Sequence, residues 1–580
     1  MILVSTLRKV AIAVVMAVTI SMFVALPALG ASNSSSTRCI DVYFLAYSQS
    51  SHSGAAIPAK ICLEPYTGER VVVKGAAYGK SLLDSFIVAV HDLETYCGLN
   101  LSDYTILVDF EEHGLKISGS SGSLLFALAV LDLMNRTHLP PRGWSATGVT
   151  SIDGFIDAVG AVPYKLRAAE SVGIKTAYLP LLDKPFANVS GITKVFLTEI
   201  SELCRATKLQ SSSTQRSLAV NTSVLSLMYR RLSVDAHRFI EKARQIVQHI
   251  NNEKLKHELT KFIYNRSLYV RELLNEGHVY SAASLSFDTY IRTLFFAAQT
   301  YTPKELDMLI ENASHIDHHV LKELKNMHAL SLHAMTTLIV VLNRIKDSLF
   351  YISLYRNLSI VPAPRSYPPA YAALYAYARA LTVETWYDLL RIANASGGPY
   401  IEGALAIKAV DRVLDIVSNT IEFSPRYAPL SLDALADTRS YLAEQLSNAS
   451  REIVLSTLKQ LYALNARFLD PVQRIVPYLY VLYAKDLVSL GIGSVVDKIY
   501  FYSLSSLLAA ATRWALSFAT HKTLTPQIPA AVPPHRFSIK PSIGVAAWLA
   551  ASIVGLVCAL LALRPLHIVE KSSGLRLSTP

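Results

Sequence analysis

The sequence is poor in charged residues and in cysteine. Only 17% of its 580 residues are charged and five are cysteine, whereas soluble domains average about a quarter charged residues. The formal charge of +11 is spread along the chain, with no run of five basic residues and no zinc-finger or other nucleic-acid-reading motif. A charge this diffuse predicts no nucleic-acid partner. Apolar residues make up 51% of the chain, which excludes an intrinsically disordered protein.

Motifs for nucleotides and metals are also missing. Gly75–Ser81 has three residues between its two glycines, where a Walker phosphate loop needs four. His315 and His319 have the i, i+4 spacing of a metal pair, but no glutamate follows His315, so the zinc-protease motif is not met. The sequence therefore predicts neither an ATPase domain nor a metal or other cofactor.

Both ends of the chain are apolar. Residues 1–31 contain two basic residues, a long uncharged stretch and small residues, which predicts a signal peptide or an N-terminal anchor. Residues 543–563 carry no charge and are long enough to cross a bilayer. Basic residues beyond them place the tail, residues 564–580, in the cytoplasm. We therefore expect a single-pass cell-membrane protein whose large domain is extracytoplasmic and whose C-terminal transmembrane helix contacts the membrane.

Asparagine usage indicates the same compartment. Ten of the 17 asparagines begin an Asn-x-Ser/Thr sequon without proline, against roughly three expected by chance. A Ser-rich chain also produces accidental sequons, but the excess favours a glycoprotein. The ten are Asn33, Asn100, Asn135, Asn188, Asn221, Asn265, Asn312, Asn357, Asn394 and Asn448.

Four cysteines lie outside the expected membrane segment, where disulfides can persist. Two β-rich segments flank a polar loop, and if the loop runs from Ser48 to Ser53, Cys39 faces Cys62 across the hairpin. We therefore predict a Cys39–Cys62 disulfide. A loop one residue longer would place Leu63 opposite Cys39 instead. Cys97 and Cys204 are the second candidate pair.

Composition divides the chain into segments. Residues 38–210 alternate β-rich and helical stretches, which predicts an α+β domain. Residues 211–222 are rich in Ser, Gln and Thr and read as a linker. Residues 223–522 have helical periodicity nearly throughout, and Thr302–Glu305 has the pattern of a helix start, so we expect an all-α multi-helix domain. Residues 523–542 are proline-rich and predict a stiff spacer.

The most informative stretch runs from Ser118 to Pro180. Gly119–Gly122 opens an apolar helix, so the amides at the helix start point outward with positive character. A serine here lies beside ready oxyanion donors. Downstream come Thr147–Val149, Tyr164–Ala169 and Gly173–Pro180.

In these motifs, their order and their approximate spacing, the chain resembles the proteolytic domain of Lon proteases. The likeness covers residues 38–210 and is to the Lon-like Ser-Lys peptidases of the secreted or membrane-anchored archaeal type without the ATPase domain. It implies that Ser120 is the nucleophile, that Lys165 is its general base, and that Thr147 holds the lysine amine by a hydrogen bond. The residue types suit that chemistry, because a lysine accepts a proton only when neutral, which requires apolar surroundings that lower its pKa.

The motifs depart from the family in two places. Gly119 stands where the nucleophile motif usually has proline, and Val149 replaces the glutamate of the Thr-Gly-Glu motif. Neither change removes a group of the dyad, but both affect the shape of the substrate cleft. Alternative nucleophiles lie in the same stretch: the register against the family selects Ser120, and we expect the others to cap the helix. These are Ser118, Ser121 and Ser123.

The sequence thus predicts a membrane-anchored, extracytoplasmic, ATP-independent serine endopeptidase that uses Ser120 and Lys165 to cleave peptides or unfolded segments. Its fold class is expected to be an α+β Lon-like proteolytic domain, an all-α multi-helix domain and a C-terminal transmembrane helix. The alternative is a non-catalytic surface receptor or scaffold that retains the Lon-like fold as a binding module. The oligomeric state and the role of the helical domain remain open.

Overall fold

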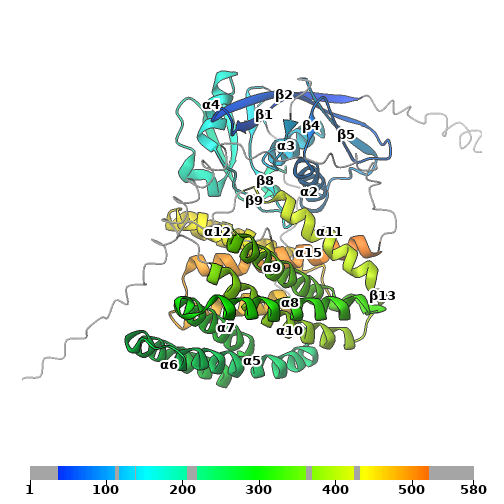
Figure 1. Ribbon diagram of the computed structural model, residues 1–580. Helices are drawn as coiled ribbons and strands as arrows, with labels where there is room; N and C mark the ends of the chain where they lie inside the picture. Colours follow the sequence, from blue (N-terminus) through cyan, green and yellow to red (C-terminus); the bar gives the residue numbers. More distant parts are fainter. Residues whose placement is uncertain are drawn as a thin grey trace, which may run out of the picture.

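The computed structural model describes residues 37–111, 116–136, 139–140, 142–204, 219–360, 369–422 and 431–520. The described chain is a mixed α/β structure that is mostly helical. Figure 1 shows a smaller α/β part above a larger helical part, with α11 (Gly403–Thr420) and α12 (Leu432–Glu444) at the boundary between them. We refer to residues 37–204 as the α/β part and to residues 219–520 as the helical part.

A four-stranded sheet forms one side of the α/β part, in the order β1-β2-β5-β3. Strands β1 (Arg38–Ser48) and β2 (Ser53–Pro65) form an antiparallel hairpin that pairs Ser48 with Ser53 and Cys39 with Cys62. This is the register expected for the shorter loop. The structure joins Cys39 to Cys62, whose Cα atoms are 4.1 Å apart, and also joins Cys97 to Cys204.

Helices cover this sheet and lead into a second one. The first sheet also contains β3 (Val71–Lys74) and β5 (Tyr104–Phe110), and the helices α2 (Lys80–Cys97) and α3 (Ser123–Leu133) pack against each other beside it. Its aromatic core includes Phe86 and Phe126, whose rings stack at 4.4 Å between centroids.

A three-stranded parallel sheet completes the α/β part. Its order is β11-β10-β7, and α4, which carries Lys165, packs against the β1–β2 hairpin. Short segments connect these layers. The remaining elements are β4 (Ala77–Tyr78), β6 (Lys116–Ile117), β7 (Trp144–Ala146), β8 (Val149–Thr150), β9 (Ile156–Asp157), α4 (Val162–Ser171), β10 (Thr176–Pro180), β11 (Thr193–Leu197) and the 3-10 helices η2 (Leu181–Phe186) and η3 (Ile200–Leu203).

The helical part stacks long helices around one apolar core. Helix α8 begins with the capping box predicted at Thr302 and Glu305. One short strand pair, β12 with β13, interrupts the expected all-α pattern. The elements are α5 (Thr222–Gln248), α6 (Glu253–Asn275), α7 (Val279–Phe296), η4 (Ala298–Thr300), α8 (Pro303–Lys325), β12 (Ala329–Ser331), η5 (Leu332–Ala334), α9 (Met335–Ile360), α10 (Pro369–Ala395), β13 (Tyr400–Glu402), α11 (Gly403–Thr420), α12 (Leu432–Glu444), α13 (Asn448–Ala466), α14 (Ile475–Ser489) and α15 (Val495–Thr520).

The two parts are joined by buried polar contacts and a shared core. Leu442 and Leu458 of the helical part belong to the same apolar cluster as Phe86 of the α/β part. The guanidinium of Arg439 on α12 is fully buried and donates to Asp153 at 2.8 Å and to Asp157 at 2.7 Å. Because charges inside a protein persist only when paired, these contacts fix α12 against the α/β part.

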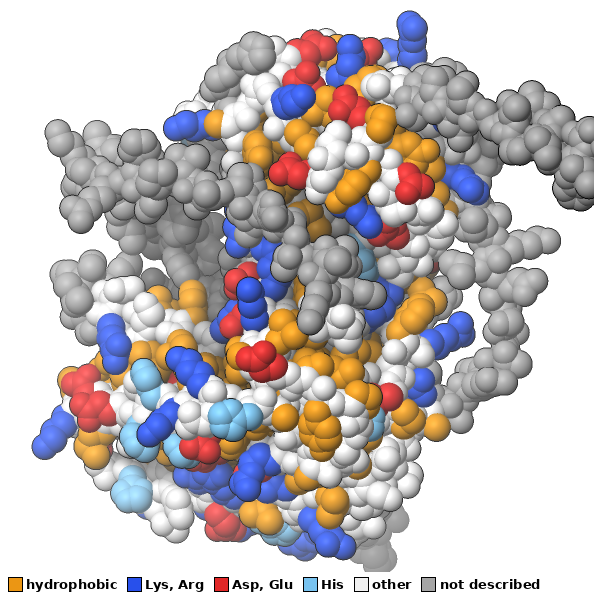
Figure 2. Space-filling view, turned by 90° about the vertical axis from the view of Figure 1, so that its right-hand side faces the viewer, with side chains coloured by type: hydrophobic (Ala, Val, Ile, Leu, Met, Phe, Trp, Pro, Cys, Tyr) orange, Lys and Arg blue, Asp and Glu red, His pale blue; other side chains and the backbone are white. Residues whose placement is uncertain are grey.

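Charges on the surface are mixed in sign. On the face drawn in Figure 2, basic and acidic side chains are interspersed over both parts, with hydrophobic side chains between them. Lys346 illustrates the pattern, with Asp411 at 3.5 Å and Asp415 at 3.0 Å. The positive excess of the sequence therefore forms no single basic patch on this face.

The predicted C-terminal transmembrane helix, and with it the predicted single-pass membrane location, is not supported by the described structure. Within the residues that the structure describes, no helix is long and apolar enough to cross a membrane. The structure supports a mixed α/β, mostly helical fold, and it does not support a single-pass membrane protein. The predicted N-terminal segment, spacer, transmembrane helix and tail, and most of the linker, lie outside the described residues: 1–31, 523–542, 543–563, 564–580 and 211–218.

Candidate active site

Ser120 lies in the short loop between β6 and α3. Gly119 before it has a φ of +101°, a conformation that favours glycine, and its amide donates to the Ser81 hydroxyl at 3.0 Å. This turn carries Ser120 inward, so that only 1% of the residue is exposed. Its hydroxyl donates to the backbone carbonyl of Thr420, at 2.6 Å between oxygens.

The loop that contains Thr147 is bonded directly to the serine loop. The Gly148 amide donates to the Ser121 carbonyl at 2.9 Å, and the Thr150 amide donates to the Ser123 hydroxyl at 2.9 Å. The Thr147 hydroxyl donates to the Ser121 carbonyl at 3.4 Å. Ser123, an alternative nucleophile, therefore holds the neighbouring loop, and α3 has no side-chain cap.

Lys165 reaches this loop from α4. The helix starts after Ala161, which adopts a φ of +60°, an uncommon conformation for a residue with a side chain. The Lys165 amine donates to the Thr147 hydroxyl at 3.3 Å. Thr147 thus links the Lys165 amine to the loop that carries Ser120, through the carbonyl of the adjacent Ser121.

Burial gives this lysine unusual electrostatics. Lys165 is 2% exposed, and the neighbouring Val162 and Leu166 are buried as well. Burial lowers the pKa of the Lys165 amine, while the carboxyl groups of Glu422 and Asp183 act in the opposite direction. The lowered pKa increases the fraction of neutral amine, which is the form that accepts a proton.

Two acidic residues near Lys165, Asp183 and Glu422, were not predicted from the sequence. Asp183 lies in η2, accepts a hydrogen bond from the Val159 amide at 3.1 Å, and has its pKa raised to about 8 by burial. Glu422 follows α11, and loss of hydration at its carboxyl raises its pKa, against the opposing effects of Lys165 and of a hydrogen bond from Ser121. Although Glu422 is exposed as a whole residue, its carboxyl faces inward: a Cβ on Gly119 would lie 3.0 Å from Glu422 Oε1.

The end of α11 occupies the space in front of the serine. Thr420 takes the Ser120 hydrogen bond, and Glu422 lies against Gly119 and Ser121. Upstream, Arg412 and Asn419 of α11 donate to the buried Asp84 of α2, at 3.2 and 2.8 Å. The cavity left beside Thr420, Ile421 and Glu422 is about 10 Å³, which is too small for a peptide.

The two proposed catalytic groups are not bonded to each other. Ser120 and Lys165 both belong to the described residues, but each makes its assigned hydrogen bond elsewhere, to Thr420 and to Thr147. This geometry describes a closed site. Removal of the Thr420 carbonyl would free the hydroxyl to turn toward another acceptor.

Comparison with known proteins assigns no family to this site. No protein-family model matches the chain, and no curated protein matches it in sequence. The functional argument therefore depends on the residues and geometry described above.

Proposed function

We propose that this protein is an ATP-independent serine peptidase in which Ser120 is the nucleophile and Lys165 the general base. The observation that carries the proposal is the Lys165 amine, buried, bonded to Thr147 and held beside the serine loop in surroundings that lower its pKa. Lysine side chains are rarely buried in proteins. A lysine that accepts a proton near neutral pH, however, needs surroundings that lower its pKa, and burial provides them.

The chemistry follows from these positions. The neutral amine of Lys165 takes the proton of the Ser120 hydroxyl while the serine oxygen attacks the peptide carbonyl carbon. The developing oxyanion needs backbone donors beside Ser120. They must come from amides other than those of Ser123 and Leu124, which donate to the Ser120 and Gly148 carbonyls. Lys165 then passes the proton to the leaving amine, leaving an acyl-enzyme, and water activated by the same amine releases the acid and restores the serine. Substrates are peptides or unfolded segments, because the sequence contains no ATPase motif.

The closed geometry adds a requirement to the proposal. A substrate carbonyl must take the place of the Thr420 carbonyl at Ser120, so Thr420–Glu422 must move first. The contacts that hold α11 to Asp84 resist this movement. The described conformation therefore corresponds to a latent enzyme.

The same closure supports the rival function, a non-catalytic binding module. If α11 never leaves the site, the serine is a structural donor to Thr420 and the lysine a buried residue of the core. The two functions differ in whether Ser120 becomes reactive when α11 is loosened.

The test is labelling of the full-length protein with a fluorophosphonate, which reacts with activated serines. Wild type is compared with Ser120→Ala, with Lys165→Ala and with the α11-loosened variant Arg412→Ala/Asn419→Ala. Ser118→Ala is the matched control, because Ser118 is an exposed serine of the same loop. We expect labelling of wild type and stronger labelling of the loosened variant, unchanged in Ser118→Ala and lost in Ser120→Ala and Lys165→Ala. Absence of label from both wild type and the loosened variant would favour the binding module.

A further inference from the structure

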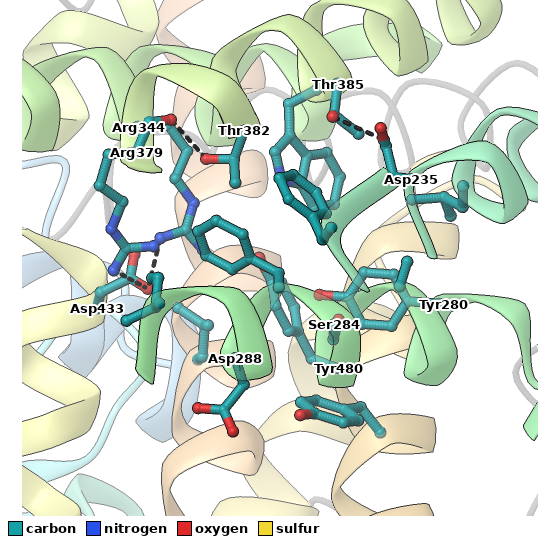
Figure 3. A pocket seen from close by; sticks show the side chains of 18 of the residues that line it. Asp235, Tyr280, Ser284, Asp288, Arg344, Arg379, Thr382, Thr385, Asp433 and Tyr480 are labelled. Atoms are coloured by element: carbon teal, nitrogen blue, oxygen red, sulfur yellow. Dashed lines mark hydrogen bonds and ion pairs between the residues drawn. The ribbon is translucent and has the colours of Figure 1, made fainter. Parts of the chain in front are cut away.

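The helical part contains a second cavity, separate from the one at the candidate active site. Its volume is about 250 Å³, space for several waters at about 30 Å³ each. Its lining comes from α5, α7, α9, α10, α12, α14 and α15. Figure 3 shows the charged residues Arg344, Arg379 and Asp433 gathered at one end and Asp235 at the other.

Aromatic rings form the walls between these ends. Tyr280 lies edge-on to Tyr480, with 5.7 Å between ring centroids, and 6.4 Å from the indole of Trp386. Rings at these distances leave flat apolar faces, which favour a flat aromatic ligand over an extended aliphatic one. The side chain of Asp288 on α7 keeps 33% of its exposure, which places the cavity opening beside that helix.

Two arginines and two carboxyl groups meet at one end of the cavity. Arg344 pairs with Asp433 at 3.0 Å, and a second carboxyl, Asp347, lies behind them. Burial and the charge of Asp433 raise the pKa of Asp347 well above its ordinary value, against the opposing effect of Arg344. Both guanidinium groups stay charged, because arginine does not deprotonate in proteins. Asp433 is the carboxylate that lies nearest to Arg344, at 3.0 Å, and it lies 3.8 Å from Arg379.

One donor at this end has no acceptor. The Nε–H of Arg379 is buried and has no hydrogen-bond partner among the described residues, and the nearest carboxylate oxygen, of Asp347, is 3.9 Å away. Buried donors are almost always bonded, since an orphan costs the free energy of its lost hydration. An anion in the cavity would supply the missing acceptor, and an Arg fork binds a carboxylate in two places.

At the opposite end, each carboxylate is paired with an arginine. Asp235 Oδ2 lies 2.8 Å from Arg231 and accepts from the Thr385 hydroxyl at 2.7 Å. Asp235 Oδ1 has no hydrogen-bond partner among the described residues, but lies 3.8 Å from the Arg238 guanidinium. Asp288 is paired with Arg292 at 2.9 Å. These carboxylates have cationic partners outside the cavity, whereas the Arg379 Nε–H at the first end has no acceptor among the described residues.

We propose that this cavity binds a small aromatic carboxylate, with its carboxylate on Arg379 and its ring between Tyr280, Trp386 and Tyr480. The site is independent of the proposed peptidase chemistry, because none of these residues contributes to the Ser120 site. The competing occupant is an organic cation stacked on the aromatic faces, which would leave Arg379 without its acceptor.

Calorimetric titration of the full-length protein distinguishes the two. The probes share one ring system and differ in charge: indole-3-acetate, indole and tryptamine. We expect indole-3-acetate to bind at least tenfold tighter than indole, and tryptamine to bind more weakly than either. Tighter binding of tryptamine, or binding of none of the three at millimolar concentration, would overturn the proposal.

Variants locate the binding at Arg379. Arg379→Met should weaken indole-3-acetate at least tenfold and leave indole unchanged, while Arg244→Met, at an exposed position of α5 that pairs with Glu241, should leave both unchanged. If Arg379→Met fails to fold, Arg379→Lys keeps the charge without the fork and should still weaken the acetate selectively. Unchanged affinity in the folded variant would refute the site.

Discussion

Two buried polar clusters, one in each part of the molecule, handle charge in opposite ways. In the α/β part, a lysine with a lowered pKa lies near two carboxyl groups with raised pKa values, Glu422 and Asp183. In the helical part, Arg344 and Arg379 surround Asp433. A lysine can lose its proton inside a protein, whereas an arginine cannot. The first cluster is therefore suited to proton transfer and the second to holding a fixed charge.

The largest expected effect concerns the first cluster. Ser120→Ala and Lys165→Ala should each reduce peptide cleavage by about a thousandfold or more, and the double variant should be little worse than either. The reason is that the hydroxyl and the amine act in one step. Thr147→Ala, which removes only the hydroxyl that positions the amine, should cost less. Cleavage rates of an unstructured fluorogenic peptide measure this, and full activity of Ser120→Ala would place the nucleophile elsewhere.

The next largest expected difference between the two clusters is in how much a substitution changes the free energy of unfolding. Arg344→Met leaves Asp433 without its closest cation, and breaking a buried pair in this way costs about 3–5 kcal/mol in the free energy of unfolding. Lys165→Met replaces a buried amine by an apolar group of similar length and should change it by less than about 1 kcal/mol, or raise it. Urea denaturation measures both.

Arg244→Met is the control for this comparison, because Arg244 belongs to an exposed pair with Glu241 and should stay within about 0.5 kcal/mol of wild type. Equal losses for Arg344→Met and Lys165→Met would show that both clusters carry fixed charge, and would break the comparison.

Loosening α11 should raise activity by a smaller factor. Arg412→Ala/Asn419→Ala removes two hydrogen bonds to the buried Asp84. A closed form weakened by about 1.4 kcal/mol is populated about tenfold less relative to the open one, so cleavage should rise by up to about tenfold. Lys408→Ala, at an exposed position of the same helix, should leave the rate unchanged. A lower rate in the loosened variant would mean that α11 supports the site.

The smallest expected effect is on pH dependence. Activity should rise with pH as Lys165 loses its proton, with a midpoint below the roughly 10.4 of an ordinary lysine. The Glu422 carboxyl favours the protonated amine, so Glu422→Gln should move the midpoint toward lower pH. Glu170→Gln, an exposed acid on α4, should leave it in place. A rate that falls between pH 7 and 9 would contradict a lysine base.

Local patterns predicted much of the α/β part. Two β-rich segments around a polar loop predicted the β1–β2 hairpin, and of the two registers left open the structure has the one that pairs Cys39 with Cys62. The apolar helix expected after Gly119–Gly122 is α3, which begins at Ser123. The ordered motifs drew attention to Ser120, Thr147 and Lys165, which the fold places together.

Periodicity could not predict how the two parts combine. The sequence predicted two domains joined by a linker, yet Arg439 of α12 is buried against Asp153 and Asp157 of the α/β part. From the sequence, an arginine in a helix is expected at the surface. The burial of Arg439 could not be predicted locally, because its aspartate partners lie 282 and 286 positions away. Glu422 could not be predicted for a similar reason: it is far from Lys165 in the sequence, and its carboxyl acts on the lysine only because α11 packs beside the serine loop.

By itself, the sequence determined the strands, the helices and the residue types able to perform serine chemistry, because these depend on neighbours within a few positions. Tertiary structure alone decided that the Thr420 carbonyl holds the Ser120 hydroxyl. It also decided that Arg379 has an unpaired donor at a cavity wall. The reason is physical: burial, pKa and hydrogen-bond partners depend on which distant segments exclude water from a group, and no local pattern encodes that.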